Sequence, residues 1–279
     1  MSDSVVSADV RCHVCGARSS GFGSARVLGR IDVQYFQCSR CRFVQTEQPY
    51  WLDEAYSTAL IAADVGAVER NLRLAGITHA LIQQCFAVDG PFLDYGGGYG
   101  LFVRLMRDRG FDFRWHDRYA KNLLSIGFEA DPNEKSFELV TAFEVLEHLV
   151  EPIDEIEAMF ARSSGSLLCT TELLPTSNPG PGDWWYYVPS GGQHISIYSM
   201  ESLHRIAERL GCNLISVGAS LHLFTRRRIS ERVLRLVSHP VVSGVLNRMR
   251  RRRSLISEDF ERLTGETLNG TNMTGDRRT

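Results

Sequence analysis

The 279-residue sequence has no apolar run near the roughly 18 residues that a membrane-spanning helix needs. Its N-terminus also lacks a basic segment followed by an apolar one, so we expect a cytoplasmic protein. It has no internal repeats and 43% of its residues are hydrophobic, which excludes a coiled coil, a collagen and a fully disordered chain. Only two lysines occur, Lys121 and Lys135, so arginine carries almost all the positive charge. The net charge of -2 indicates no general preference for a polyanionic partner.

Seven cysteines make an odd number, which does not suit a disulfide framework and is typical of a reducing compartment. Three lie within apolar segments: Cys85, Cys169 and Cys212. The other four form two Cys-x-x-Cys pairs with 22 residues between the pairs: Cys12, Cys15, Cys38 and Cys41. Two such pairs can hold zinc tetrahedrally, whereas a redox motif needs only one pair. We therefore expect residues 1–48 to form a small ribbon held by a structural zinc without a catalytic role.

Apolar residues spaced mainly by three and four predict helix over residues 49–90. We interpret this segment as an amphipathic bridge, and the alternative is a lid whose aromatic side chains cover a ligand. Near the other end, residues 226–253 hold ten arginines against one acidic residue, in a mostly helical pattern broken at Pro240. We expect this Arg-rich helical extension to span 226–263 and the Gly-, Thr- and Asn-rich residues 264–279 to be disordered.

Short apolar strands alternate with helical stretches between residues 91 and 225. The strands are expected at 91–95, 111–117, 128–130, 137–143, 166–171, 212–217 and 220–225. The helices are expected at 101–109, 119–126, 152–162 and 199–210. This alternation predicts an α/β core in which helices cover both faces of a parallel sheet. Ligands of such sheets bind at the carboxyl ends of the strands.

A glycine-rich loop follows the first of these strands, in Asp94-Tyr95-Gly96-Gly97-Gly98-Tyr99-Gly100. Glycines there let bare backbone approach a ligand at the start of a helix. A dinucleotide fingerprint would have its third glycine at position 101, where this sequence has Leu101, and this counts against a nicotinamide cofactor. The spacing Asp-x-Gly-x-Gly-x-Gly instead resembles the S-adenosylmethionine loop of class I methyltransferases, and the resemblance covers residues 91–225.

That resemblance implies a Rossmann-like, seven-stranded and mostly parallel sheet. It also implies that the loop binds S-adenosylmethionine through Asp94, Gly96, Gly98 and Gly100. Asp117 ends the second strand, 23 residues after Asp94, where class I methyltransferases place the carboxylate that accepts both ribose hydroxyls. Asp131, after the third strand, is the candidate for the adenine edge.

A cluster of acidic residues and histidine follows the fourth strand, where Glu144, Glu147 and His148 are spaced i, i+3 and i+4. A helical turn would project them on one side. Their pattern resembles the Glu-x-x-Glu-His of plant small-RNA 2′-O-methyltransferases and ubiquinone-pathway O-methyltransferases, where it is a metal site. The resemblance implies that the cluster, together with His194, could hold Mg²⁺ or Mn²⁺ and lower the pKa of an acceptor hydroxyl. The alternatives are His148 as a metal-free general base oriented by Glu147, and a merely structural turn.

Four consecutive aromatic residues lie after the fifth strand, over the edge of the sheet where an acceptor should bind: Trp184, Trp185, Tyr186 and Tyr187. Flat aromatic surfaces pack against the C–H faces of sugars and against bases, so these residues are candidates for binding a ring-shaped acceptor. The alternative is that two of them fill the core.

The ribbon, the cofactor loop and Glu147-His148 together resemble the sugar C-methyltransferases of deoxysugar pathways, although those proteins continue into a long C-terminal domain. Tyr-Gly-Gly-Gly-Tyr-Gly and Gln-His-Ile-Ser-Ile-Tyr-Ser look more like short bacterial methyltransferases of cell-surface polysaccharide clusters. Together with the resemblance of Glu144, Glu147 and His148 to O-methyltransferases, they lead us to expect O-methylation of a sugar or glycan intermediate of surface polysaccharide or deoxysugar biosynthesis, either a small molecule or lipid-linked. Sugar C-methylation and methylation of RNA or protein are the alternatives.

The arginine-rich residues 226–253 admit three interpretations: a solvated helix end, attraction to an anionic membrane surface or to nucleotide-sugar phosphates, and RNA binding. The negative overall charge and the weakly basic ribbon count against RNA.

Overall fold

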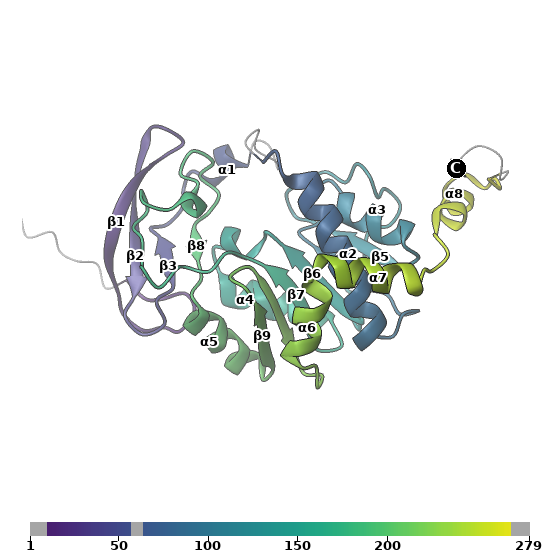
Figure 1. The fold of residues 1–279 in the computed structure, drawn as a ribbon. Helices are drawn as coiled ribbons and strands as arrows, with labels where there is room; N and C mark the ends of the chain where they lie inside the picture. The colour runs from purple at the N-terminus through teal and green to yellow at the C-terminus, as the bar shows by residue number, and fades with distance from the viewer. Residues whose placement is uncertain (1–9, 57–63, 269–279) are drawn as a thin grey trace, which may run out of the picture.

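The computed structural model describes residues 10–56 and 64–268, which fold around two β-sheets (Figure 1). The main sheet has the strand order β5-β4-β6-β7-β10-β9. Its strands are β4 (Phe92–Tyr95), β5 (Phe113–His116), β6 (Leu139–Phe143), β7 (Ser166–Thr170), β9 (Asn213–Val217) and β10 (Leu221–Thr225). Strands β5, β4, β6 and β7 pair in parallel, whereas β10 runs antiparallel to both β7 and β9. The sheet is therefore mixed.

This sheet differs from the seven-stranded, mostly parallel one that the sequence predicts. Within residues 10–56 and 64–268, it has six strands, because the expected strand at 128–130 contributes only a bridge between Glu129 and Trp115. The expected helix at 119–126 is wrong as well. Instead, the Asn122 side chain accepts hydrogen bonds from the backbone N–H and the hydroxyl of Ser125, which favours a turn over a helix. The remaining strands and helices expected in 91–225 are present within two residues of their predicted ends.

Successive side chains of the strands point to opposite faces of the main sheet, and each face carries its own apolar cluster. Phe92, Leu139 and Leu168 pack toward α2 (Ala67–Cys85), α3 (Leu101–Asp108) and α6 (Glu231–Ser238). Leu93 and Val140 pack toward α4 (Pro152–Arg162) and α5 (Met200–Leu210). The expected layering, with helices on both faces, is confirmed.

The second sheet has four strands in the order β1-β2-β3-β8 and lies at one end of the molecule (Figure 1). Its first three strands are β1 (Ser19–Val27), β2 (Ile31–Cys38) and β3 (Val44–Thr46). The fourth, β8 (Ser196–Ile197), comes from the segment between β7 and α5, and it pairs antiparallel with β3. We call this the small sheet. The N-terminal segment is thus completed by a strand that lies between β7 and α5 in the sequence.

The segment at 49–90 is not one helix. It contains α1 (Leu52–Ala55) and α2, and the expected helical positions Leu60 and Ile61 lie outside the described residues. Helix α2 is largely buried in its second half, where it packs against α3, α6 and α7 (Pro240–Met249). This arrangement favours a structural element over a lid for α2.

The Arg-rich extension is helical, as expected, and Pro240 begins a new helix, α7, after α6. A further helix, α8 (Ile256–Thr264), lies at the end of the molecule opposite the small sheet (Figure 1). It is anchored by a buried ion pair in which Arg107 donates to both carboxylate oxygens of Asp259, at 2.9 and 2.6 Å. No helix in the described ranges combines the length and apolarity that crossing a bilayer requires. Residues 269–279, most of the expected disordered tail, lie outside the described residues.

Candidate active site

The glycine-rich loop joins the carboxyl end of β4 to the start of α3. Gly96, Gly98 and Gly100 all have positive φ, at 71°, 53° and 86°. A Cβ added at Gly96 would lie 2.5 Å from the Val145 side chain, so a side chain is excluded there by packing. A Cβ at Gly98 would meet no atom within 4 Å. The loop therefore presents Gly98 to open space, as a backbone that approaches a ligand requires.

Asp117 follows β5 and holds this loop in place. Its Oδ2 accepts a hydrogen bond from the backbone N–H of Gly98 at 2.9 Å, and its Oδ1 accepts from Tyr119 and Ala120, both at 2.7 Å. A carboxylate offers about four acceptor positions, so one is left over. Asp117 thus orders the loop and still offers an acceptor at the carboxyl end of β5. Ribose recognition by this residue stays a prediction.

Replacing Asp117 with alanine should weaken the binding of S-adenosylhomocysteine by about tenfold to a hundredfold, because charge-assisted hydrogen bonds are lost. Isothermal titration calorimetry measures the affinity. The matched control is Asp32→Ala, which removes a carboxylate that is 71% exposed on the small sheet. Unchanged affinity in Asp117→Ala would remove this residue from the ribose role.

Asp94 lies at the end of β4 and is only 3% exposed. Its Oδ1 accepts a hydrogen bond from the Thr141 hydroxyl at 2.6 Å, yet burial raises the pKa of the carboxyl to about 7. The folded protein therefore keeps this carboxyl protonated to a higher pH than the unfolded chain does. Its ionisation disfavours the folded state as the pH rises from about 4 to about 7.

The Asp94→Asn variant should lack this pH dependence. Its thermal stability relative to the natural protein should therefore increase between pH 5 and pH 8, with a limit of about 3 kcal/mol in the free energy of unfolding. Melting temperatures measured at both pH values test this. If the difference in melting temperature between the two proteins is the same at pH 5 and pH 8, Asp94 is already ionised in the folded protein at pH 5.

Asp131, the candidate for the adenine edge, is exposed in a turn. Its Oδ1 accepts from the backbone N–H of Asn133 at 2.7 Å, and its backbone carbonyl accepts from Arg162 at 2.7 Å. These contacts fix the turn. The adenine role stays a prediction.

The Glu/His cluster lies after β6, but the structure separates its members. Glu144 has a φ of 54°, and the 3-10 helix η1 begins only at Leu146 (Leu146–His148), so Glu144 is not part of the turn. Its carboxylate accepts a hydrogen bond from the Thr170 hydroxyl at 2.7 Å. The one-sided projection predicted for Glu144, Glu147 and His148 is therefore wrong for Glu144.

Glu147 is fully buried, and neither of its carboxylate oxygens has a hydrogen-bond partner among the described residues. Burial, reinforced by the charge of Glu144, raises the pKa of Glu147 to about 8. The hydroxyls of Thr171 and Tyr186, which lie beside it, bond each other at 3.2 Å. A buried carboxylate without partners is costly unless a cation or a ligand completes it.

Two partly buried imidazoles face this carboxylate. The Nδ1 of His148 lies 3.1 Å from the Gln193 carbonyl, and the Nδ1 of His194 lies 2.5 Å from the Tyr186 carbonyl. A carbonyl oxygen can only accept, so each Nδ1 carries the proton and each Nε2 keeps a free lone pair. Burial lowers the pKa of His148 to about 3 and that of His194 to about 4, so both rings are neutral at pH 7.

One ligand atom from each of Glu147, His148 and His194 lies within 4.8 Å of the others. Two neutral histidines and one carboxylate, each imidazole oriented by a carbonyl, are a donor set that fits a divalent metal. We call these three residues the Glu-His-His cluster. The sequence predicted all three, and the fourth predicted ligand, Glu144, is not part of the set.

The four aromatic residues after β7 separate into two pairs. Tyr186 and Tyr187 are buried, in the 3-10 helix η2 (Trp185–Tyr187), whereas Trp185 is 70% exposed and Trp184 is partly buried. The Tyr187 ring packs edge-on against Tyr35 of β2. Its predicted contact with an acceptor is therefore wrong, because the ring fills the core of the small sheet.

Two features near the cluster have no signal in the sequence. Tyr56, at the end of α1, stacks on Tyr119 with ring centroids 4.8 Å apart and also lies edge-on to His148 at 6.1 Å. Arg70 of α2 forms a two-bond ion pair with Asp64, and the charges of Glu144 and Glu147 contribute to raising the pKa of Arg70. Helical spacing placed Tyr56 among apolar positions, and only the tertiary fold brings it to the site.

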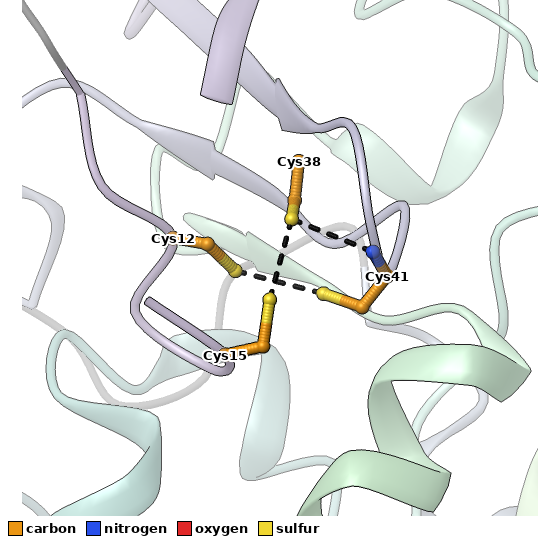
Figure 2. Close-up of side chains that lie close together, drawn as sticks. All are labelled: Cys12, Cys15, Cys38 and Cys41. Carbon is orange, nitrogen blue, oxygen red and sulfur yellow. Dashed lines mark hydrogen bonds between the residues drawn. The ribbon is translucent and has the colours of Figure 1, made fainter. Parts of the chain in front are cut away.

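The four cysteines of the N-terminal segment come together as predicted, and Figure 2 shows their sulfur atoms pointing toward one another. The Sγ atoms of Cys12 and Cys41 are 3.6 Å apart, and those of Cys15 and Cys38 are 3.4 Å apart. In a tetrahedral zinc site with bonds of about 2.3 Å, neighbouring sulfurs lie about 3.8 Å apart. The contact between Cys12 and Cys41 lowers the pKa of Cys12 and raises that of Cys41, because the two sulfurs share one proton. The cluster fits zinc in number, type and spacing of donors.

Comparisons with known proteins agree with this geometry. A family model described as "Methyltransferase domain" matches residues 68–217, more than half of the chain. No curated protein matches the sequence. Among solved structures, TnmH is 17% identical with a TM-score of 0.46, covering 64% of this chain and 62% of that one. An O-methyltransferase family protein from Burkholderia thailandensis is 14% identical with a TM-score of 0.41, covering 63% and 67%.

The chain thus spans less than two thirds of TnmH. The family match does not depend on these structures. It covers the glycine-rich loop, Asp117 and the Glu-His-His cluster in one segment. The chain therefore belongs to the methyltransferase-domain family.

Proposed function

We propose that the protein transfers the methyl group of S-adenosylmethionine to a hydroxyl of a sugar or glycan intermediate in surface polysaccharide or deoxysugar biosynthesis. The observation that carries this proposal is the Glu-His-His cluster: a buried carboxyl group and two imidazole Nε2 atoms that have no hydrogen-bond partner among the described residues. Glu147 and His148 follow β6, whose neighbour in the main sheet, β4, leads into the glycine-rich loop. Donor loop and cluster thus lie at the same edge of the sheet.

A saccharide hydroxyl is a poor nucleophile at neutral pH, so the reaction needs a group that removes its proton. In the transfer, the hydroxyl oxygen attacks the methyl carbon while the carbon–sulfur bond breaks, and S-adenosylhomocysteine leaves. We assign the proton to Nε2 of His148. The carbonyl of Gln193 holds this ring in the tautomer that leaves Nε2 free to accept it. Burial lowers the pKa of this ring, and the neighbouring carboxylate of Glu147, when ionised, would offset that effect and stabilise the protonated ring.

The Glu-His-His cluster could also hold a divalent metal, with Glu147 supplying oxygen and the two histidines supplying nitrogen. Such an ion, when bound, lowers the pKa of a coordinated hydroxyl. In that case His194 and His148 act as ligands through Nε2, and their backbone partners keep both rings in place. EDTA should stop methyl transfer if the cluster holds a catalytic metal, and it should leave transfer unchanged if His148 is a metal-free base.

The saccharide assignment draws on two groups of side chains near the cluster. The exposed Trp185 and the partly buried Trp184 offer flat apolar surface on the loop that also carries Tyr186, and the Tyr186 ring lies 4.7 Å from that of His194. Arg70 and Asp64, which are partly buried, supply charged hydrogen-bonding groups from α2 and the residues before it. Aromatic faces combined with polar groups suit a ring that carries hydroxyls.

The test uses the purified protein with methyl-labelled S-adenosylmethionine and separate acceptor pools: nucleotide-sugars, lipid-linked glycans, RNA and protein. Label in either sugar-containing pool is the expected result. Its loss with EDTA, and its return with Mg²⁺ or Mn²⁺ while the zinc content stays constant, would support the metal site. Label only in RNA or protein would overturn the saccharide assignment. Carbon-linked instead of oxygen-linked methyl in the product would favour sugar C-methylation.

A further inference from the structure

The outward faces of α6 and α7 expose apolar side chains. On α7, Val241, Val245 and Met249 are 68%, 51% and 77% exposed and follow one another at intervals of four residues. On α6, Leu236 is 54% exposed. Residues at this spacing share one side of a helix, while the opposite side of α7 packs against α2. The described structure leaves this apolar stripe uncovered.

Arginines flank the stripe on the same faces. Arg232 and Arg235 lie on α6 near Leu236, and Arg248 and Arg251 lie at the end of α7, all four exposed. Glu231 is the one acidic residue in 226–253, and it is already paired with Arg235. We call these two outward faces the α6–α7 surface.

Three of the six other arginines of the segment bind groups elsewhere in the protein. Arg227 binds Glu138 at 2.7 Å, Arg252 binds Asp89 at 2.6 Å, and Arg226 donates to the carbonyl of Leu210 at 2.9 Å. The interpretation as a solvated helix end therefore fails for these three. On the α6–α7 surface, Arg232, Arg248 and Arg251 form no ion pair among the described residues, so they are available to an anionic partner.

Charge is distributed unevenly between this surface and the rest of the chain. Ten of the 31 basic residues but only one of the 33 acidic residues lie in 226–253, which leaves 21 basic against 32 acidic residues elsewhere. An anionic surface would attract the α6–α7 surface and repel the remainder, so approach would occur in one orientation. An open hollow of about 610 Å³, lined by Ser230, Glu231, Arg232 and Arg235, lies at the start of α6.

We propose that the α6–α7 surface docks on an anionic phospholipid surface, with Val241, Val245 and Met249 entering the headgroup region and the arginines contacting lipid phosphates. This inference rests on the proposed saccharide methylation, because it assigns a lipid-linked acceptor to the same site. Exposed apolar side chains flanked by arginine are the composition of helices that lie on membranes.

The geometry of α2 connects this surface to the active site. The Asn247 side chain of α7 donates to the carbonyl of Gly76 in α2 at 3.0 Å. Six residues earlier on α2, Arg70 lies within reach of the charges of Glu144 and Glu147. Six residues of helix span about 9 Å, so one helix, α2, joins the element that carries the α6–α7 surface to the side of the molecule that carries the active site.

A phospholipid surface explains the observations better than two other partners. A second copy of this chain, docked face to face through a twofold axis, would place the same arginines opposite one another. RNA would use the arginines but would gain little from an aliphatic stripe. Only a lipid surface uses both the charge and the exposed aliphatic side chains.

The test is cosedimentation of the full chain with vesicles of phosphatidylcholine, with and without phosphatidylglycerol as about one third of the lipid. No donor or acceptor is present, so the outcome is independent of the methyl-transfer reaction. We expect binding only to the anionic vesicles, and about tenfold or more weaker binding for the double variant Arg232→Glu/Arg248→Glu. The matched control, Arg26→Glu/Arg205→Glu, makes the same charge change on other exposed surfaces and should bind normally. Val245→Ser/Met249→Ser should weaken binding without a change of charge.

Equal binding by the test and control variants, or no binding to anionic vesicles, would overturn the proposal. A dimer in size-exclusion chromatography that dissociates in Arg232→Glu/Arg248→Glu would assign the surface to a second copy instead, and RNA capture without vesicle capture would assign it to RNA. The proposed function is tested separately, by methyl transfer to a water-soluble saccharide. The result of that assay does not depend on whether the protein binds vesicles.

Discussion

Replacing His148 with alanine should lower kcat for methyl transfer by about a thousandfold while leaving the affinity for S-adenosylhomocysteine within about twofold of normal. The reason is the position of the ring: its Nδ1 is committed to the Gln193 carbonyl, and its Nε2 belongs to the Glu-His-His cluster. The cofactor loop is fixed by Asp117 and by glycine packing, which do not involve His148. Single-turnover transfer and calorimetry measure the two quantities.

His204→Ala is the matched control for this variant. His204 is exposed on α5 and bonds only within its own helix among the described residues, so its loss should change neither quantity. Retained turnover in His148→Ala would exclude this residue both as base and as essential ligand. His194→Ala separates the two routes, because a metal site loses bound Mn²⁺ in both histidine variants, whereas a metal-free base at His148 leaves His194→Ala active.

Most of the main sheet could be predicted because its elements are specified locally. The apolar runs at 137–143 and 166–171 are long enough to indicate buried strands, and β6 and β7 form within them. The strand expected at 128–130 failed because only Glu129 bridges to Trp115. Strand β8 could not be predicted from the sequence, because two residues are too few to show an alternation of apolar and polar positions. Its partner β3 also lies about 150 residues away in the sequence.

The active site likewise combines parts that are specified locally with parts that depend on residues distant in the sequence. The glycine-rich loop and Glu147-His148 are contiguous motifs, and the structure keeps each of them in one place. Glu144 departs from the motif because Thr170, on the neighbouring strand β7, binds its carboxylate and its backbone N–H. Tyr56 and Arg70 reach the site through the packing of α1 and α2. No spacing in the sequence encodes such long-range contacts.

The small sheet ties the four-cysteine cluster to the active site. Strand β3 follows Cys41 and pairs with β8, which begins two residues after His194. The backbone N–H of Ile195, between them, donates to the carbonyl of Glu147 at 3.0 Å. On the other side, the Ser199 hydroxyl donates to the carbonyl of Cys41 at 2.6 Å. Glu147 and His194 are thus held in place by the small sheet, and the four cysteines lie at the other end of that sheet.

Cys38→Ser should therefore lower both stability and activity. Cys38 ends β2, and its sulfur accepts N–H contacts from Arg40 and Cys41, each at 3.4 Å. Loss of one of four thiolate ligands should remove bound zinc and lower the melting temperature by about 10 °C or more. Methyl transfer should fall by about tenfold or more even at temperatures where the main sheet stays folded, because His194 loses the support of β3 and β8.

Zinc content by mass spectrometry, melting temperature and kcat are measured on the same preparations. Cys212→Ser is the matched control, since Cys212 lies outside the cluster and its loss should change none of the three. A Cys38→Ser protein that loses zinc but keeps full activity would show that the ribbon folds independently of the active site. A protein that keeps both zinc and stability would contradict a structural metal at these cysteines. The joint loss of zinc, stability and transfer is expected, because the strand that positions His194 is completed by the ribbon.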